Sequence, residues 1–375
     1  MTARDVKAIG TLVMCIDSVS VAGQPFFMGL GDLPGDPFES IAYALSADGR
    51  TVVGAGRSGI ETEAVVFSSG TVTGLGDLDD GEFYSNALGV SSDGLVIVGQ
   101  ATGPNAPRSA VRWVNGSIST LGELSLHAYS EAWDVAADGS TIVGASGQEA
   151  FVWAESSGMV GLGDLTGGIL SSIAYAVSDN AAVIVGKGNN ADGRPEAVRW
   201  VYGSPQALGF LGTGLESTAR SVSGDGLVIV GWSATGGVGG TQGFRWESGE
   251  MVGLGGLPGE EAGSSAFAVS YDGSLVGGTA MSSIPGGIEA VLWDRTLGIR
   301  RVKDILTDLG ISANGWTLAQ VTGLSADGKT IIGSGRNPSN QQEGWIAHIP
   351  EPSTVSFLFL FLLMPRCRQS VLSGR

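Results

Sequence analysis

One short motif occurs seven times along this chain of 375 residues and constrains its fold more than any other feature. Each copy ends in a run rich in Val, Ile or Leu followed by glycine, and six of the seven copies begin with Ser or Ala, one variable residue and Asp-Gly. The copies are Ser46–Gly54, Ser91–Gly99, Ala136–Gly144, Ser178–Gly186, Ser223–Gly231, Ser270–Gly278 and Ser325–Gly333. Their final glycines are 42–55 residues apart. A repeat of this length is one supersecondary unit that must stack on its neighbours to bury its apolar face.

Each repeat can be divided into four short strands, A to D. Strand A alternates apolar and polar residues, as in Ile41–Leu45, and strand B is the β-branched run of the motif. The Asp-Gly pair between them predicts a two-residue type I′ turn with positive φ at both positions. Strand C ends on Phe or Trp, and strand D leads into a Gly-Leu-Gly-Asp-Leu box such as Gly74–Leu78.

Four strands in about 45 residues, with an aromatic residue in each repeat, are typical of a β-propeller blade. The seventh repeat lacks its own strand D, whereas a surplus box, Met28–Leu33, precedes the first strand A. We therefore predict an all-β, seven-bladed propeller over residues 27–349, closed by the N-terminal strand, with the strand C aromatics between neighbouring blades. A β-solenoid is the alternative fold.

Composition excludes several functional classes. The net charge is −17 with only four lysines, which argues against binding to nucleic acid. The two cysteines, Cys15 and Cys367, lie outside the repeats, so no disulfide framework or cysteine-based metal site stabilises them. The histidines, His127 and His348, have no metal-ligand spacing and no accompanying nucleophile motif.

Both ends of the chain predict sorting signals. Residues 1–23 carry Arg4 and Lys7 before an apolar stretch and small residues, which is typical of a secretory signal peptide. At the other end, Pro350, Glu351 and Pro352 precede an apolar run of about ten residues, too short for a membrane-spanning helix. The basic residues that follow are Arg366 and Arg368.

The order of these C-terminal elements resembles the bacterial PEP-CTERM sorting signal. The resemblance covers residues 350–375 and implies an exosortase-like enzyme as partner, with transient membrane contact of the tail during export. A C-terminal hydrophobic anchor is the alternative. The protein is then expected outside the cell or on the surface of a bacterium with an outer membrane.

The repeats themselves resemble the HAF repeat of bacterial extracellular proteins, on the basis of the Gly-Leu-Gly-Asp-Leu box, the Ser-x-Asp-Gly turn and the Arg-Trp-bearing strand C. The resemblance covers Phe27 to about His348. It implies secretion and a repeat architecture, and it assigns no activity.

No catalytic residue or cofactor is predicted. The box aspartates Asp32, Asp77 and Asp164 are interpreted as turn caps that accept backbone N–H bonds. Calcium is the alternative, because it prefers several carboxylate oxygens. A sialidase-like activity has only one weak match, at Ser46–Val52.

The B–C and D–A loops, which share one face of a propeller, differ most among the repeats. Because function concentrates on loops of a rigid scaffold, Tyr84, Trp232 and Trp316 on this face are candidate ligand-stacking residues. We predict a non-catalytic binding or structural module, associated with exopolysaccharide or a surface protein. The alternative is a polysaccharide hydrolase or lyase, which two carboxylates with Arg or His at the channel mouth would favour.

Overall fold

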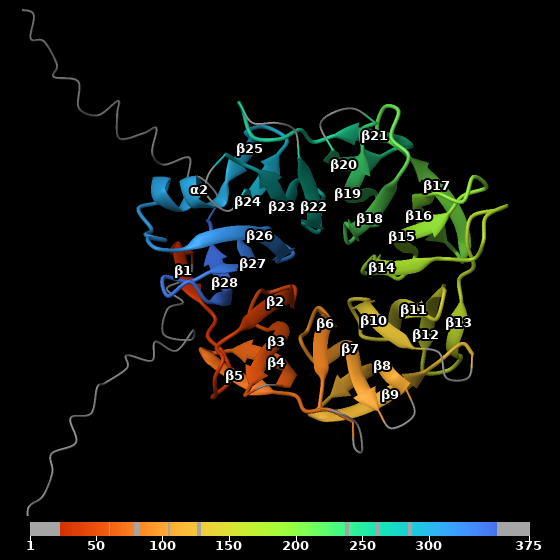
Figure 1. The fold of residues 1–375 in the computed structure, drawn as a ribbon, viewed down its shortest axis with the longest axis horizontal. Helices are drawn as coiled ribbons and strands as arrows, with labels where there is room; N and C mark the ends of the chain where they lie inside the picture. The colour runs from red at the N-terminus through yellow and green to blue at the C-terminus, as the bar shows by residue number, and fades with distance from the viewer. Residues whose placement is uncertain are drawn as a thin grey trace, which may run out of the picture.

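The computed structural model describes residues 23–350, apart from 60, 79–82, 104–105, 126–128, 237–239, 260–262 and 284–286. These residues form seven four-stranded antiparallel sheets arranged as blades around a central channel (Figure 1). The seven-bladed propeller predicted from the repeats is confirmed, and the solenoid alternative is wrong.

The innermost strand of each blade is strand A, followed outward by strands B, C and D. The A strands are β2 (Ser40–Leu45), β6 (Ser85–Val90), β10 (Ser130–Val135), β14 (Ile173–Val177), β18 (Ser217–Val222), β22 (Ser264–Val269) and β26 (Thr317–Leu324). The B strands are β3 (Val52–Ser58), β7 (Val96–Gly103), β11 (Thr141–Ser146), β15 (Val183–Asn189), β19 (Val228–Ala234), β23 (Leu275–Met281) and β27 (Thr330–Arg336).

The outer two strands carry the aromatic residues and the box. The C strands are β4 (Glu61–Ser68), β8 (Ala106–Val114), β12 (Glu149–Ala154), β16 (Pro195–Val201), β20 (Thr241–Glu247), β24 (Ile288–Asp294) and β28 (Gln342–His348). The D strands are β5 (Thr71–Gly74), β9 (Ser117–Gly122), β13 (Gly158–Gly161), β17 (Ser204–Gly209), β21 (Glu250–Gly253), β25 (Gly298–Arg301) and, for the last blade, β1 (Phe26–Gly29).

Strand β1 completes the ring, as the surplus box predicts. It pairs antiparallel with β28, with Phe26 opposite His348 and Gly29 opposite Trp345. The N–H of Gly31 also donates to Glu343 Oε1 at 3.0 Å. This pairing joins the two ends of the propeller and covers a strand edge that would otherwise be open to association.

The hydrophobic core lies between the blades. Each cluster of buried side chains in the described residues combines residues from two neighbouring blades and contains at least one strand C aromatic residue. Trp113, for example, packs with Val53 and Ala64 of the preceding blade. The predicted wedge position of these aromatics is confirmed, and it explains why one repeat cannot be stable alone.

The D–A connection between the last two blades contains the helix α2 (Val302–Asp308), where the sequence pattern predicts only a loop. Val302, Ile305 and Leu306 are buried in the cluster between the last two blades. Three apolar residues at helical spacing are too few to reveal such a short helix in the sequence. It lies on the outer side of the ring (Figure 1) and extends the core there.

Candidate functional site

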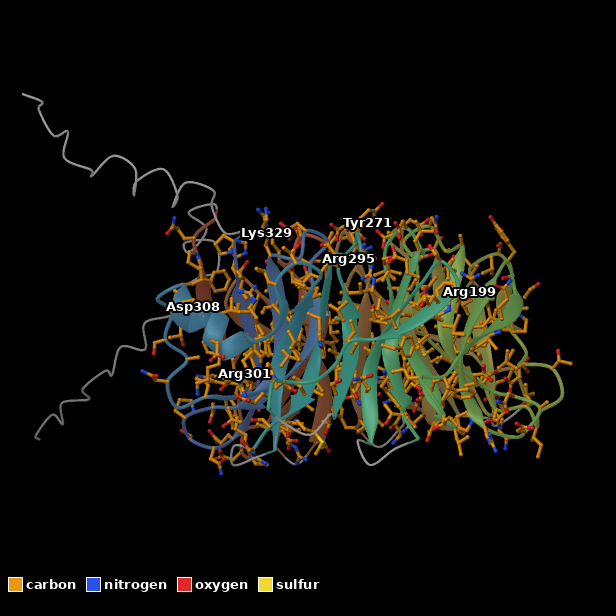
Figure 2. All side chains as sticks on the ribbon, turned by 90° about the horizontal axis from the view of Figure 1, so that it is seen from above. Arg199, Tyr271, Arg295, Arg301, Asp308 and Lys329 are labelled. Carbon is orange, nitrogen blue, oxygen red and sulfur yellow. The ribbon has the colours of Figure 1, made fainter. Side chains whose placement is uncertain are left out.

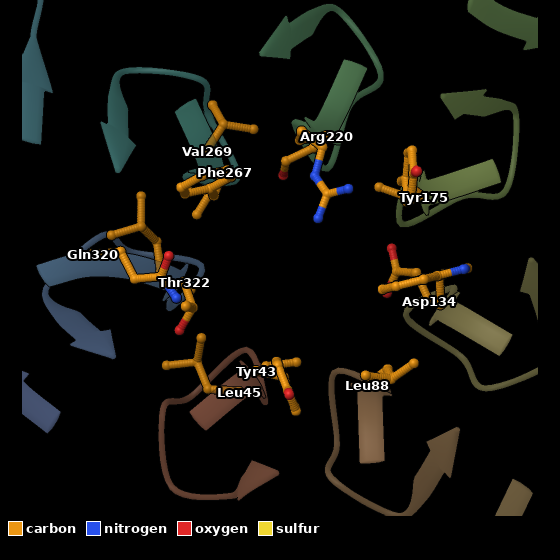
Figure 3. Close-up of a pocket in the computed structure, with 17 residues that line it drawn as sticks. Tyr43, Leu45, Leu88, Asp134, Tyr175, Arg220, Phe267, Val269, Gln320 and Thr322 are labelled. Carbon is orange, nitrogen blue, oxygen red and sulfur yellow. The ribbon is translucent and has the colours of Figure 1, made fainter. Parts of the chain in front are cut away.

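A β-bulge in every strand A aims one side chain into the central channel. The pairing with strand B skips one residue in each A strand, and in β26 it skips Ala319 as well. The seven residues skipped at the equivalent position are Tyr43, Leu88, Trp133, Tyr175, Arg220, Phe267 and Thr322. All seven line the same channel cavity (Figure 3), so the sequence places one variable residue per blade around it.

The last glycine of the repeated motif makes this bulge possible. A Cβ atom on Gly144 would lie 1.9 Å from the carbonyl oxygen of Glu131 in the neighbouring strand A. The equivalent glycines of the other six blades would meet a strand A carbonyl oxygen at 1.9–2.1 Å. The bulge pushes this carbonyl toward strand B, and only glycine leaves room for it.

The A–B turns form a closed ring of main-chain hydrogen bonds around one end of the channel. In each turn the residue before the Asp or Asn donates its N–H to the equivalent carbonyl of the next blade, at 3.0–3.3 Å. The members are Ala47, Ser92, Ala137, Asp179, Gly224, Tyr271 and Ala326, whose N–H returns to Ala47. Tyr271 and Lys329 of two such turns lie along one edge of the disc (Figure 2). The ring ties every blade to its neighbour at this end.

The turns differ from the type I′ geometry predicted. Gly49 has φ of +71°, whereas Asp48 is not among the described residues with positive φ. Gly49 N–H donates to Ser46 O, and Asp48 accepts bonds from the Ser46 hydroxyl and the Arg50 N–H. The prediction was wrong because the serine hydroxyl and the aspartate close a longer loop, in which only the glycine needs positive φ.

The channel cavity has a volume of about 340 Å³ and two unlike sides. Blades 1, 2 and 6 contribute mainly apolar side chains, among them Leu45, Leu88 and Phe267, and blade 7 adds the uncharged polar side chains of Gln320 and Thr322. The charged groups come from blades 3 and 5 alone, as Asp134 and Arg220, and Arg220 is the one cation in the lining (Figure 3). A second cavity of about 150 Å³ lies at the level of the hydrogen-bond ring and shares Asp134.

Three consecutive bulge residues form a stack on the polar side. Trp133 meets Tyr175 edge-on, with ring centroids 5.3 Å apart. The Arg220 guanidinium carbon lies 4.2 Å from the centroid of the Tyr175 ring. Burial lowers the pKa of Arg220 and raises that of Tyr175. Among the described residues no carboxylate forms an ion pair with Arg220.

Asp134 occupies a position that is small in every other blade. The residues at this position are Ala44, Gly89, Ala176, Ser221, Ala268 and Gly323. Asp134 Oδ1 accepts the N–H of Val135, and Oδ2 accepts the N–H of Val177 in the next blade at 2.9 Å. Burial, together with the negative charge of nearby Asp179, raises the pKa of Asp134 to about 7, although the two backbone hydrogen bonds lower it.

The Gly-Leu-Gly-Asp-Leu box is structural, as its turn-cap interpretation predicts. Asp32 accepts the N–H groups of Leu33, Glu39 and Arg57. Asp77 and Asp164 hold their loops in the same way. In the part of the chain that the structure describes, no group of three or more His, Cys, Asp or Glu side chains is arranged to hold a metal ion.

The three predicted stacking aromatics lie apart from the channel, on different blades. The Tyr84 hydroxyl accepts a bond from Asn86 Nδ2 at 2.8 Å, and Arg108 lies 5.8 Å from its ring centroid. Trp232 is half-buried in β19. Trp316 is half-buried and packs edge-on against Phe27 at 5.3 Å. The structure does not bring these three together, and their role in binding stays a prediction.

The sequence interpretation missed the channel residues. Their one sequence signal is the position three residues before the repeated motif, as at Trp133 before Ala136, where the seven repeats carry six different types of side chain. Of the predicted sorting residues only Pro350 is described. Glu351, Pro352, Arg366 and Arg368 lie outside the described residues, as do residues 1–22 of the predicted signal peptide.

Comparison with known proteins identifies the fold alone. No family model and no curated protein matches the sequence. The β-propeller domain of the Trilobed protease from Pyrococcus furiosus is similar over 86% of this chain and 93% of its own, with 13% identity and a TM-score of 0.50. That domain is described as having an open velcro topology, whereas β1 and β28 are paired here.

Two TolB structures are also similar. A putative TolB from Agrobacterium tumefaciens has 12% identity and a TM-score of 0.45, over 84% of this chain and 99% of its own. TolB from Acinetobacter baumannii has 13% identity and the same TM-score, over 68% of this chain and 64% of its own. No helix among the described residues is long and apolar enough to cross a membrane.

Proposed function

We propose that this chain is an exported, non-catalytic binding module whose ligand enters the central channel. The observation that carries the proposal is the two-sided cavity of about 340 Å³, apolar on one side and lined by Trp133, Tyr175 and Arg220 on the other. Pockets of this size, largely apolar with a few convergent polar groups, are typical ligand sites. The surrounding repeat fixes the wall, because every blade is tied to the next at the hydrogen-bond ring.

The positions of the carboxylates support binding rather than catalysis. Asp134 is the one carboxylate in the lining of the larger cavity, and both of its oxygens already accept backbone N–H bonds. Most glycoside hydrolases need two carboxyl groups that flank the scissile bond. Asp179 lies at the ring, in the smaller cavity. The channel therefore offers one carboxylate, Asp134, whose two oxygens are already hydrogen-bonded. It also offers one cation, Arg220, that has no carboxylate partner among the described residues.

Export and attachment to the matrix follow from the sequence signals at both ends and form part of the same proposal. The test is cell fractionation of the producing bacterium with a tag placed in the exposed C–D turn at Ser248 and Gly249, which takes no part in the hydrogen-bond ring. Replacement of Pro350, Glu351 and Pro352 by alanine is expected to retain the protein at the membrane. Unchanged release of the variant would contradict the role of the sorting signal.

Binding is tested by co-sedimentation of the purified chain with isolated exopolysaccharide of the producer. We expect Trp133→Ala to weaken the association about tenfold, since loss of a stacked aromatic costs on the order of 1.4 kcal/mol. Trp232→Ala and Trp316→Ala test the loop face in the same assay. If only these two variants lose binding, the ligand lies on the loop face and the channel proposal is wrong.

A polysaccharide hydrolase or lyase is the second candidate, and one observation favours it. Asp134, with a pKa of about 7, shares a cavity with Arg220 and Tyr175, and a carboxyl group that titrates near neutral pH suits general acid–base chemistry. Release of reducing ends or unsaturated products from the same polysaccharide, abolished in Asp134→Asn, would establish this activity. Binding without any such release would exclude it for that substrate.

A further inference from the structure

We propose that the channel recognises a singly charged sugar acid, a hexuronate, whose carboxylate pairs with the Arg220 guanidinium. This inference rests on the proposed function, because it names the ligand class of the same cavity. It is carried by a partly buried cation that faces the cavity and lacks a partner anion among the described residues (Figure 3).

A guanidinium removed from water without a counter-ion is costly, so such groups are normally paired. Every salt bridge of the described arginines lies elsewhere, and Arg220 packs against the ring of Tyr175. Tyr175 supports one face of the guanidinium. The N–H donors of the planar fork match the two oxygens of a carboxylate.

The charge of the cavity lining favours a ligand that carries a single negative charge. Arg220 is its one cation and Asp134 its one anion. When Asp134 is protonated the lining carries one positive charge, which balances a carboxylate but not a phosphate dianion. The whole chain carries −17, so any anion enters against a repulsive field, and a multiply charged one is disfavoured most.

The rest of the wall suits a sugar ring. Trp133 and Tyr175 present half-exposed aromatic surfaces, while Ser221, Gln320 and Thr322 add polar groups around the same cavity. Thr322 donates its hydroxyl to the carbonyl of Ala42 and keeps a lone pair for a ligand hydroxyl. A cavity of about 340 Å³ accommodates one sugar ring of about a dozen heavy atoms, at the lower end of the usual size range for ligand pockets.

Asp134 adds a pH dependence. The groups that face it are the N–H groups of Val135 and Val177, with Asp179 and the channel side chains Tyr175 and Arg220. Its ionisation cancels the positive charge of the lining and repels the ligand. We therefore expect affinity for the uronate to fall about threefold to tenfold between pH 6 and pH 8, although the uronate itself stays ionised throughout.

The experiment is calorimetric titration of the full chain with sodium glucuronate and galacturonate, with glucose, galactose and inorganic phosphate as comparison ligands. We expect the uronates to bind at least about tenfold more tightly than the neutral sugars, as for other charge-assisted bonds. Arg220→Gln should abolish this preference, and Asp134→Asn should remove the decline toward pH 8.

Two further variants keep the test interpretable. Arg199→Gln is the matched control, because Arg199 lies over Trp246 at 4.4 Å in the same kind of stack but outside the channel. It should bind uronate as the wild type does. Arg220→Lys keeps the charge and loses the fork, so it should retain part of the preference and serves where Arg220→Gln does not fold.

The outcomes separate the inference from the proposed function. Equal binding of glucose and glucuronate, stronger binding of phosphate, or unchanged uronate affinity in Arg220→Gln would each overturn the inference. If exopolysaccharide still binds in those cases and Trp133→Ala weakens it, the proposed function stands. If free uronate binds through Arg220 but no matrix polysaccharide does, the inference stands and the matrix role is wrong.

Discussion

Two neighbouring positions of the repeat behave in opposite ways. The glycine that ends each strand B motif is the same in all seven blades, whereas the bulge residues of the adjacent A strands are of six different types, with tyrosine in two blades. Both belong to one structural device, because the glycine makes room for the carbonyl that the bulge displaces. The comparison teaches that the invariant half of the device maintains the fold and the variable half is free to form a ligand site.

The largest effect is expected when a methyl group is added at the invariant glycine of the motif. Gly144→Ala places a Cβ atom 1.9 Å from Glu131 O and 2.8 Å from the Phe151 ring, so the blade must shift. We expect a loss of about 3 kcal/mol or more in the free energy of unfolding. The measurement is urea denaturation followed by tryptophan fluorescence.

Gly243→Ala is the matched control for that experiment. Its Cβ would meet only ordinary contacts of 3.4–3.6 Å, and five of the other blades carry alanine at this position. It should raise the free energy of unfolding by about 0.5 kcal/mol, because alanine restricts the unfolded chain. Similar losses in both variants would mean that the motif glycine has no special steric role.

Asp134 tests the variable side of the comparison through pH. Burial raises its pKa to about 7 in the folded protein, whereas the unfolded chain loses this proton near pH 4. The stabilisation that comes from holding this proton is therefore complete in acid and is lost as the pH rises from about 4 to 7. We expect the stability advantage of Asp134→Asn over the wild type to grow by about 2.5 kcal/mol between pH 5 and pH 8, measured by denaturation at each pH.

Asp138→Asn provides the opposite sign in the same series. The backbone N–H of Ser140 holds the pKa of Asp138, in an exposed A–B turn, below its usual range. The contribution of the Asp138 carboxylate to stability is present above the ordinary carboxyl pKa and is lost as the pH falls below it.

One result would contradict the prediction for Asp134. If the wild type becomes more stable than Asp134→Asn toward pH 8, Asp134 is ionised and well solvated in the channel.

The smallest effect concerns the one A–B turn that departs from the motif. Ala181 stands where the other six turns have glycine, and its φ is +57°. Ala181→Gly should stabilise the protein by about 0.5–1 kcal/mol, since this region is strained for residues with a Cβ. Ala182→Gly, one residue later, should not stabilise it, and thermal melting compares the two. Stabilisation by both variants would show that the gain is unrelated to the positive φ.

The propeller fold could be predicted from the sequence because each structural position of a blade occurs seven times along the chain. The strand order, the aromatic wedge at Trp113 and the closure by Phe26–Gly29 all follow from the pattern and are confirmed. The predicted turn type was wrong. The Asp-Gly pair alone favours a type I′ turn, but the hydrogen bond from the Ser46 hydroxyl to Asp48 closes a longer loop. Helix α2 was missed, because three buried residues give too little periodicity.

The candidate site could not be predicted in this way, because its members share no motif. Trp133, Tyr175 and Arg220 lie 42–45 residues apart, and their shared position in the repeat does not by itself show that they face a channel. The bulge that turns them inward is a pairing irregularity between two strands. It becomes visible only when the register of both is known.

The sequence by itself determined the ring, since a unit of about 45 residues with one buried aromatic face must stack, and a displaced terminal strand must complete the last sheet. The tertiary structure decided what the ring contains. Seven strands converge on one axis and remove the channel side chains from water. This convergence leaves Arg220 without a carboxylate partner among the described residues and raises the pKa of Asp134. No single repeat has that environment, because the channel exists only after the ring closes.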